Sequence, residues 1–232
     1  IGTGGVIFGA LNVPTANLDA VQLINSLAPS TSYYLYIAPE DSSGNFGALI
    51  EAQFTTDPAP ENAMAFDGSS GYIALPSGFE SIITQNFTVE AWINPNSIDR
   101  YAAIVDHMEW TGGSLSGYML TLHETGELVA RVYTGTDVVN VIRTPISAGS
   151  WQHVAMTYDG VQLKLYLNGN LEESTSASGL IDYSPVPSSH NSGRFHDSNE
   201  EYFFNGQIDE VRIWDVARTQ GQIQSAFSTS LT

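Results

Sequence analysis

The segment Gln207-Ile208-Asp209-Glu210-Val211 comes closer than any other stretch of the sequence to a paired-carboxylate site. In an extended strand, residues two apart point to the same face, and a retaining glycosidase needs two carboxyl groups about 5 Å apart. Asp209 shares its face with Val211 and not with a second acid, whereas Glu210 points the other way. We therefore do not expect glycosidase chemistry on this strand.

Other kinds of catalytic site are also missing from the sequence. The chain has no cysteine, which excludes thiol nucleophiles, disulfides, zinc–thiolate sites and iron–sulfur clusters. It has no Gly-x-Ser-x-Gly motif and no Gly-rich phosphate loop that opens a helix. His153 lies in the run Trp151-Gln152-His153-Val154-Ala155, where we expect a buried histidine bonded to the backbone. We expect that the chain is not an enzyme.

The charge of the chain is strongly negative, because 7 Lys and Arg stand against 25 Asp and Glu, a net charge of −18. Nucleic acids and anionic membranes are bound through clustered cations, so we expect neither as a partner. No apolar run approaches the roughly 18 residues of a membrane span, so we expect no membrane insertion. The acidity suits Ca²⁺, which prefers oxygen ligands, but it also suits a charge that only keeps a β-protein soluble.

The elements that must position these residues are short strands. Gly, Ser, Thr, Asn and Asp recur between Val-, Ile-, Tyr- and Phe-rich runs at intervals of about 8 to 12 residues, which is typical of an all-β sandwich. Asp67-Gly68, Asp159-Gly160 and Asn168-Gly169 predict tight hairpins. Two prolines in residues 57–62 predict a linker, which divides the chain into residues 1–56 and 63–232.

The first part has two predicted strands, at residues 32–39 and 47–56. The run Leu27-Ala28-Pro29-Ser30-Thr31-Ser32-Tyr33 before the first strand resembles the tyrosine corner of fibronectin type III and immunoglobulin-like domains, with Tyr33 as the corner residue. A complete domain of that kind has about seven strands, so residues 1–56 correspond to its C-terminal part at most. Either the domain is truncated, or a neighbouring chain completes it by donating strands, which would produce self-association.

Five motifs follow in order after the linker: Phe66-Asp67-Gly68 with Tyr72-Ile73, Phe87-Thr88-Val89-Glu90-Ala91-Trp92-Ile93, Trp151-Gln152-His153-Val154-Ala155, Leu165-Tyr166-Leu167-Asn168-Gly169, and Phe204-Asn205-Gly206-Gln207-Ile208-Asp209-Glu210-Val211-Arg212-Ile213-Trp214. This set resembles the laminin G-like, concanavalin A-like jelly-roll domain, close to its pentraxin-like branch, over residues 62–232. The resemblance implies two packed antiparallel sheets, a short terminal helix capped by Thr219, and binding or adhesion. The fold class we expect is an antiparallel jelly-roll sandwich preceded by a partial immunoglobulin-like β module.

Two aspartates on the first and last strands are candidate calcium ligands. The resemblance implies that these strands are neighbours, so Asp67 and Asp209 would approach each other. Asp209 lies on the same face as Val211 and Ile213, which predicts an inward face, and a buried carboxylate is costly unless it is paired or bound to a metal. The alternative is that Asp67 caps a turn and Asp209 bonds to the backbone.

A second candidate calcium site lies in the loop before the last strand. In pentraxin-like relatives this loop supplies acidic ligands, which implies Asp197, Asn199 and Glu200, with Glu201 beside them. An earlier loop, residues 106–116, would complete the site through Asp106 and Glu109. The alternative is that residues 197–201 form a solvated acidic loop.

Aromatic side chains beside polar groups predict a ligand-binding rim. Trp110 lies in the predicted loop Met108-Glu109-Trp110-Thr111-Gly112-Gly113, where an exposed tryptophan is expensive without a use. Tyr101, Arg194 and His196 are the further residues that we expect at this rim. The alternative is that Trp110 folds back onto the sandwich.

Taken together, these features predict an extracellular binding or adhesion module that recognises a glycan or a surface protein with the help of Ca²⁺. Since Ile1 is not an initiator methionine and residues 1–15 have no signal sequence, we expect a piece of a larger, secreted or cell-surface protein, of bacterial origin by its architecture. The alternatives are a structural spacer or filament subunit completed by strand donation, and an accessory carbohydrate-binding domain of a secreted enzyme.

Overall fold

A computed structural model describes residues 32–37, 43, 48, 50–55, 63–76, 78–111, 114–135, 138–184, 186–187, 190–196 and 201–226. The chain forms two compact units, Ile1–Asp57 and Pro58–Thr232. In the first unit, β1 (Ser32–Ile37) and β2 (Ile50–Thr55) form an antiparallel pair in which Ser32 lies opposite Thr55. The side chain of Tyr33, and the rest of the predicted immunoglobulin-like module, lie outside the described residues.

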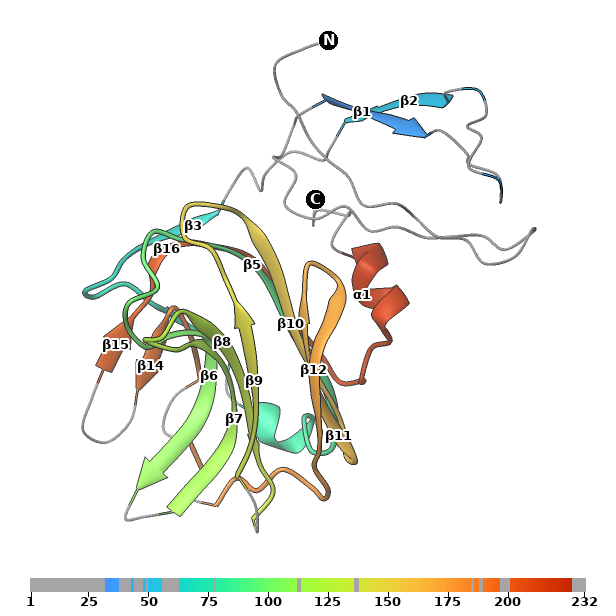
Figure 1. Cartoon of the computed structure of the whole chain (residues 1–232). Helices are drawn as coiled ribbons and strands as arrows, with labels where there is room; N and C mark the ends of the chain where they lie inside the picture. Colours follow the sequence, from blue (N-terminus) through green and yellow to red (C-terminus); the bar gives the residue numbers. More distant parts are fainter. Residues whose placement is uncertain are drawn as a thin grey trace. The chain divides into compact units, whose positions relative to one another are not determined.

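The second unit is a sandwich of two antiparallel sheets (Figure 1). The first sheet has the strand order β12 (Asn170–Ser176), β11 (Gln162–Leu167), β10 (Gln152–Asp159), β5 (Asn86–Pro95), β16 (Asn205–Trp214), β3 (Met64–Asp67). The second has the order β4 (Ile73–Ala74), β13 (Asn191–Ser192), β6 (Ala102–Thr111), β7 (Ser114–Leu122), β8 (Glu127–Tyr133), β9 (Val138–Pro145). This arrangement confirms the predicted all-β jelly-roll sandwich.

Three short elements complete the unit. The hairpin of β14 (Arg194–His196) and β15 (Glu201–Phe203) lies beside β6, as Figure 1 shows. The 3-10 helix η1 is Phe79–Ser81, and the helix α1 is Gln220–Ala226. None of the helices among the described residues has the length and hydrophobicity that a membrane span requires.

Alternation of side chains along the strands builds the core. On β5, Phe87, Val89, Ala91 and Ile93 belong to the core cluster, while the residues between them face away from it. Each of the other central strands contributes in the same way: Val154, Met156, Tyr158 from β10; Tyr118, Leu120, Leu122 from β7; Leu128, Ala130, Val132 from β8. We call the face of each sheet that is turned away from this core its outer face.

Two of the three predicted hairpins are confirmed. Asp159-Gly160 joins β10 to β11, and the Asp159 carboxylate accepts hydrogen bonds from the backbone N–H groups of the next turn residues. Asn168-Gly169 joins β11 to β12, with φ of 49° and 74°, the left-handed conformation that this turn requires. The dipeptides fixed these turns because few residues accept positive φ.

The prediction of a hairpin at Asp67-Gly68 is wrong, because β3 and β4 belong to different sheets. The Asp67 carboxylate accepts hydrogen bonds from the backbone N–H groups of Ser69 and Ser70, at 2.8 and 2.9 Å, and of Gly71. These bonds close a local turn that directs the chain out of the first sheet and into the second.

The predicted terminal helix is α1, and it packs on the outer face of the first sheet. Its Ile223 forms a small cluster with Ala155 and Tyr166. The Thr219 hydroxyl accepts a hydrogen bond from the backbone N–H of Gln222, and the Gln222 side chain accepts one from the N–H of Thr219. This reciprocal pair is a capping box, so Thr219 is the N-cap residue, as expected.

Candidate ligand-binding site

The structure does not bring Asp67 and Asp209 together, although β3 and β16 are neighbours as expected. Asp67 lies opposite Asn205, four residues along β16 from Asp209. At about 3.3 Å per residue, that separation is roughly 13 Å. The two carboxylates are therefore too far apart to bind the same calcium ion.

The prediction that Asp209 faces inward is wrong, because β16 has a bulge. The pairing of β16 with β5 shifts register between Asp209 and Arg212, and Glu210 has φ of 53°. The extra residue reverses the alternation, so that Ile208 and Val211 both reach the core while Asp209 lies on the outer face.

The Asp67 carboxylate stabilises the turn that follows β3. Its three backbone N–H donors hold the pKa of Asp67 well below its usual range, because they stabilise the charged form. Turn capping, the alternative to calcium binding at this residue, is therefore what the geometry shows.

The predicted loop of residues 106–116 is instead the end of one hairpin. β6 continues to Thr111 and β7 begins at Ser114, so Trp110 is a strand residue opposite Leu115. The loop assignment failed because cross-strand pairing extends the ladder through Met108-Glu109-Trp110-Thr111, where local sequence predicts a turn. The side chain of Trp110 lies outside the described residues.

Asp106 and Glu109 do not converge on one site. They are three residues apart on β6, and their side chains therefore project to opposite faces of the second sheet. Glu109 is buried opposite Ser116, while Asp106 lies opposite Met119 on the other face. Of the predicted loop ligands, Asp197, Asn199 and Glu200 lie outside the described residues, and only Glu201 is described, on β15.

Asp106 is the centre of the candidate site. Its side chain is 0% exposed, and its carboxylate accepts hydrogen bonds from the backbone N–H of Met108 at 3.1 Å and of His196 at 2.9 Å. Burial raises the pKa of Asp106 to about 8, although both hydrogen bonds oppose that change. The bond to His196 holds the end of β14 next to a buried carboxylate.

Arg194 fixes the other side of the β14–β15 hairpin. Its guanidinium stacks over the Tyr72 ring, 3.7 Å from the ring centroid, and pairs with Glu201 at 3.2 Å. It also donates a hydrogen bond to the side-chain oxygen of Asn191, which lies opposite Asp106 in the ladder between β13 and β6.

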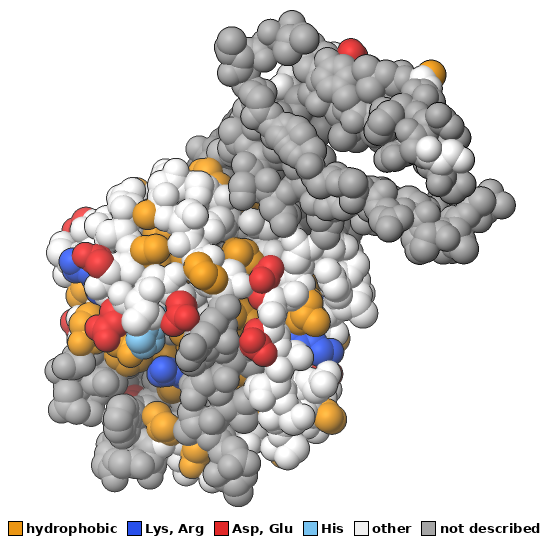
Figure 2. Space-filling view, in the orientation of Figure 1, with side chains coloured by type: hydrophobic (Ala, Val, Ile, Leu, Met, Phe, Trp, Pro, Cys, Tyr) orange, Lys and Arg blue, Asp and Glu red, His pale blue; other side chains and the backbone are white. Residues whose placement is uncertain are grey.

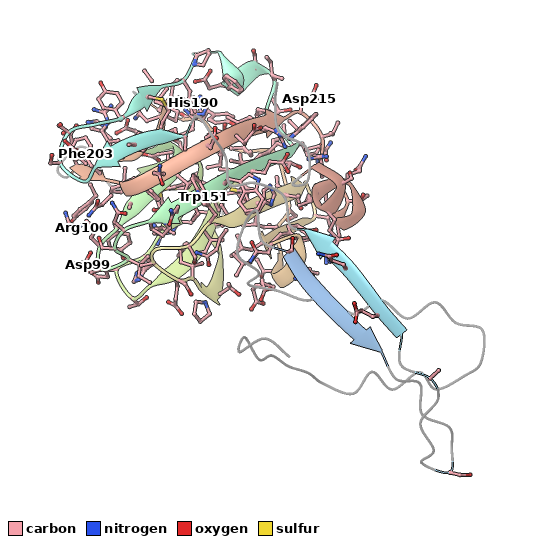
Figure 3. The ribbon with its side chains drawn as sticks, turned by 90° about the horizontal axis from the view of Figure 1, so that it is seen from above. Asp99, Arg100, Trp151, His190, Phe203 and Asp215 are labelled. Carbon is pink, nitrogen blue, oxygen red and sulfur yellow. The ribbon has the colours of Figure 1, made fainter. Side chains whose placement is uncertain are left out.

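An aromatic group lies beside this hairpin. Tyr101 is 6.4 Å from Phe195 and 5.9 Å from Tyr202 between ring centroids, and Phe195 is 5.9 Å from Tyr202. The Tyr101 hydroxyl is bonded to Nε2 of His123 at 2.7 Å. Figure 3 shows Arg100, next to Tyr101 in sequence, and Phe203, next to Tyr202, on the same side of the sandwich.

Several polar atoms around Asp106 have no partner among the described residues. They are buried side-chain atoms of one short segment: Nδ2 of Asn191, Nε of Arg194 and Nδ1 of His196. Buried polar atoms are normally bonded, so these three mark a place where the described residues leave polar groups unsatisfied. Aromatic rings beside such donors and acceptors are the usual composition of a small-ligand site.

Sequence reasoning placed Tyr101, Asp106, Arg194 and His196 in the candidate set. The structure joins Asp106 to His196 by a hydrogen bond, places Arg194 in the same hairpin, and places Tyr101 beside Phe195 of that hairpin. Sequence reasoning missed Phe195, Tyr202 and His123. The aromatic residues at positions 195 and 202, on the two strands of a short hairpin, could have indicated a binding surface. Figure 2 shows hydrophobic side chains on one face of the jelly roll, with acidic side chains and a histidine among them.

The calcium prediction has no further geometric support in the described part of the chain. There, no group of three or more His, Asp or Glu side chains is placed to hold a metal ion. Asp67 and Asp209 are separated, and Asp106 already accepts two backbone hydrogen bonds. Calcium stays a prediction for the segment that includes Asp197, Asn199 and Glu200.

Among curated proteins, the chain is similar to pappalysin-1. It is 28% identical to the mouse protein over 186 residues and 25% identical to the human protein over 191 residues. These matches cover 73% and 75% of this chain, but only 11% and 12% of the two relatives. The chain thus corresponds to about a ninth of each.

Solved structures share the fold. A protein of Bacteroides ovatus, described as a candidate carbohydrate-binding protein, matches with TM-score 0.54 and 24% identity over 85% of this chain and 56% of its own. The CBM40 of Ruminococcus gnavus IT-sialidase, bound to α2,3-sialyllactose, matches with TM-score 0.59 and 14% identity over 73% and 97%. The LG4-5 domains of mouse laminin α1 match with TM-score 0.53 and 14% identity over 75% and 47%.

A sequence profile of one family matches residues 67–224, more than half of the chain and nearly all of the jelly roll. The profile agrees with the resemblance found in the five ordered motifs; the pentraxin-like branch and the immunoglobulin-like N-terminal module stay predictions. The chain belongs to the concanavalin A-like lectin/glucanase superfamily.

Proposed function

We propose that the jelly roll is a glycan-binding module whose site lies between β6 and the β14–β15 hairpin. The observation that supports this most strongly is the gathering of Tyr101, Phe195 and Tyr202 beside buried polar atoms that have no partner among the described residues. Sugars present an apolar ring face and a rim of hydroxyl groups, and such a site matches both.

The comparisons support the same class of ligand. One similar structure is the CBM40 of a sialidase with a bound sialyllactose, and this chain covers 97% of it. Since the chain covers only 11% of mouse pappalysin-1, we infer that it acts as one module of a larger, secreted or surface protein. An accessory carbohydrate-binding domain of an enzyme fits these observations as well as an adhesion module.

We also propose that the module binds without catalysing a reaction. Two acidic side chains on β5 and β16 are engaged by cations: Glu90 is 0% exposed and pairs with Arg218 at 2.7 Å, and Glu210 pairs with Arg212. Carboxylates held in this way are not available as an acid and a nucleophile about 5 Å apart. Calcium assistance, by the loop that contains Asp197, is part of the proposal.

The test is binding of the purified chain to an array of oligosaccharides, followed by calorimetry of the strongest ligand. Tyr101→Ala and Tyr202→Ala should each weaken binding at least about tenfold, since stacked aromatic side chains are typical hot spots. Val161→Ala, which removes methyl groups from a 65% exposed residue of another turn, is the matched control and should bind normally. Unchanged affinity in both tyrosine variants would refute this location of the site.

A further inference from the structure

The few cations of this chain are mostly paired. Five of the seven Lys and Arg residues form ion pairs: Arg100 with Asp99, Lys164 with Asp159, Arg194 with Glu201, and both Arg212 and Arg218 with Glu90. The side chain of Arg143, on β9, lies outside the described residues. Arg131 is the remaining cation, and it differs from the five paired cations in its surroundings.

Arg131 has no salt bridge and no hydrogen bond with any residue that the structure describes, and its Nε is buried without a partner. This is unusual in a chain with 25 acidic residues. Burial lowers the pKa of Arg131, but a guanidinium stays charged at any physiological pH. A half-buried charge without a counter-ion is unfavourable, so the fold keeps a group that an anion would stabilise.

The position of Arg131 links it to the proposed site. Met119 lies opposite Asp106 on one side and opposite Arg131 on the other, so the three residues form a row across the outer face of the second sheet. Two strand spacings of about 4.8 Å separate the ends of this row, or roughly 10 Å. Tyr101 also acts electrostatically on Arg131, which places the arginine close to the aromatic group.

We propose that Arg131 binds the anionic group of an acidic glycan, a carboxylate or a sulfate, while the sugar packs against Tyr101 and its aromatic neighbours. The inference rests on the proposed function and specifies its ligand. A guanidinium recognises such groups through two parallel hydrogen bonds.

The net charge of −18 does not contradict an anionic ligand. Exposed charges are screened beyond about 8 Å at physiological ionic strength, so a local cation determines the interaction at the site.

The experiment compares glycans in matched pairs on the full chain. The probes are 3′-sialyllactose and 3′-sulfolactose against lactose, and oligogalacturonate against its methyl ester. Arg131→Gln removes the charge, Arg131→Lys keeps it without the fork of two donors, and Lys164→Gln is the charge-matched control on the first sheet. Because Arg131 has no partner among the described residues, the Gln variant should melt at or above the wild-type temperature.

The expected result is that the wild-type chain prefers the acidic member of a pair, and that this preference weakens at high salt. Arg131→Gln should weaken binding of the acidic member at least about tenfold, since hydrogen bonds to charged groups are worth about 1.5–3 kcal/mol, and should leave the neutral member unchanged. A preference for 3′-sialyllactose or oligogalacturonate would indicate that Arg131 binds a carboxylate, and a preference for 3′-sulfolactose would indicate a sulfate.

Two results would overturn the inference alone: equal binding of neutral and acidic members, or an acid preference that survives Arg131→Gln. In both cases the module would still bind glycans and the proposed function would stand. Binding of no oligosaccharide, in these pairs or on the array, would overturn the proposed function and the inference together.

Discussion

Replacing Asp106 by Asn should stabilise the protein at alkaline pH, although the residue lies at the centre of the candidate site. The ordinary pKa of an aspartate is 3.8, and burial raises that of Asp106 to about 8. A raised pKa means that the folded state holds the proton more tightly than the unfolded state. The stability that this proton contributes is fully present below pH 3.8 and is lost as the pH rises towards 8.

The size of the effect follows from the same two values. Each pH step between them is worth about 1.36 kcal/mol, so ionising the buried carboxyl costs roughly 6 kcal/mol at most. Asn avoids this cost, but its amide N–H₂ opposes one of the two backbone donors, from Met108 and His196, which costs about 1–3 kcal/mol. The variant should therefore be about 3 kcal/mol more stable at pH 8, or about 6–12 °C in melting temperature.

The assay is thermal unfolding of wild type and Asp106→Asn, followed by circular dichroism from pH 4 to pH 9 at constant ionic strength. The difference in melting temperature should grow in favour of the variant as the pH rises. Asp67→Asn is the control of opposite sign, because the N–H groups of its turn lower the pKa of Asp67. That variant should be less stable at neutral pH and equal to wild type in strong acid. The reasoning would be refuted if Asp106→Asn were less stable than wild type at pH 8, or if the difference in melting temperature between the two proteins did not change with pH.

Three further predictions concern the fold and the metal. Glu90→Gln should cost about 3–5 kcal/mol in urea unfolding, because it leaves Arg212 and Arg218 without their buried partner; an unchanged midpoint would contradict this. Gly117→Ala should lower the free energy of unfolding by about 3 kcal/mol or more, since Gly117 has φ of 85° and a Cβ there would lie 1.9 Å from the His107 carbonyl oxygen. A calcium site filled at 100 times its dissociation constant should add about 2.7 kcal/mol, and equal melting in calcium and in chelator would remove calcium from the proposed function.

Local sequence determined the turns and the helix end. Asp159-Gly160 and Asn168-Gly169 form the hairpins that their residue types predict, because the φ preferences of a turn act within two residues. The capping box of Thr219 and Gln222 is equally local. The order of the five motifs was enough to predict the jelly roll, since alternation assigns each strand one core face.

Long-range pairing decided the features that sequence reasoning got wrong. The bulge between Asp209 and Arg212 inverts the faces of β16, and alternation along the strand cannot show an inserted residue. Trp110 joins a strand because β7 pairs with it. Asp67-Gly68 turns towards the second sheet because the partner of β4 is β13, more than a hundred residues later in the chain.

The sequence by itself determined that this chain is an acidic, all-β jelly roll with aromatic and acidic candidates for a binding site. Only the tertiary structure decided which candidates meet. Asp106 and His196 are 90 residues apart, and they are joined by one hydrogen bond. Arg131 has the pattern of an ordinary solvent-facing strand residue, and its lack of a partner among the described residues emerges only from the pairing of its strand. Composition and the alternation of side chains can be read from residues that are neighbours in sequence. Burial and pairing depend on residues that are far apart in sequence and meet only in the folded structure.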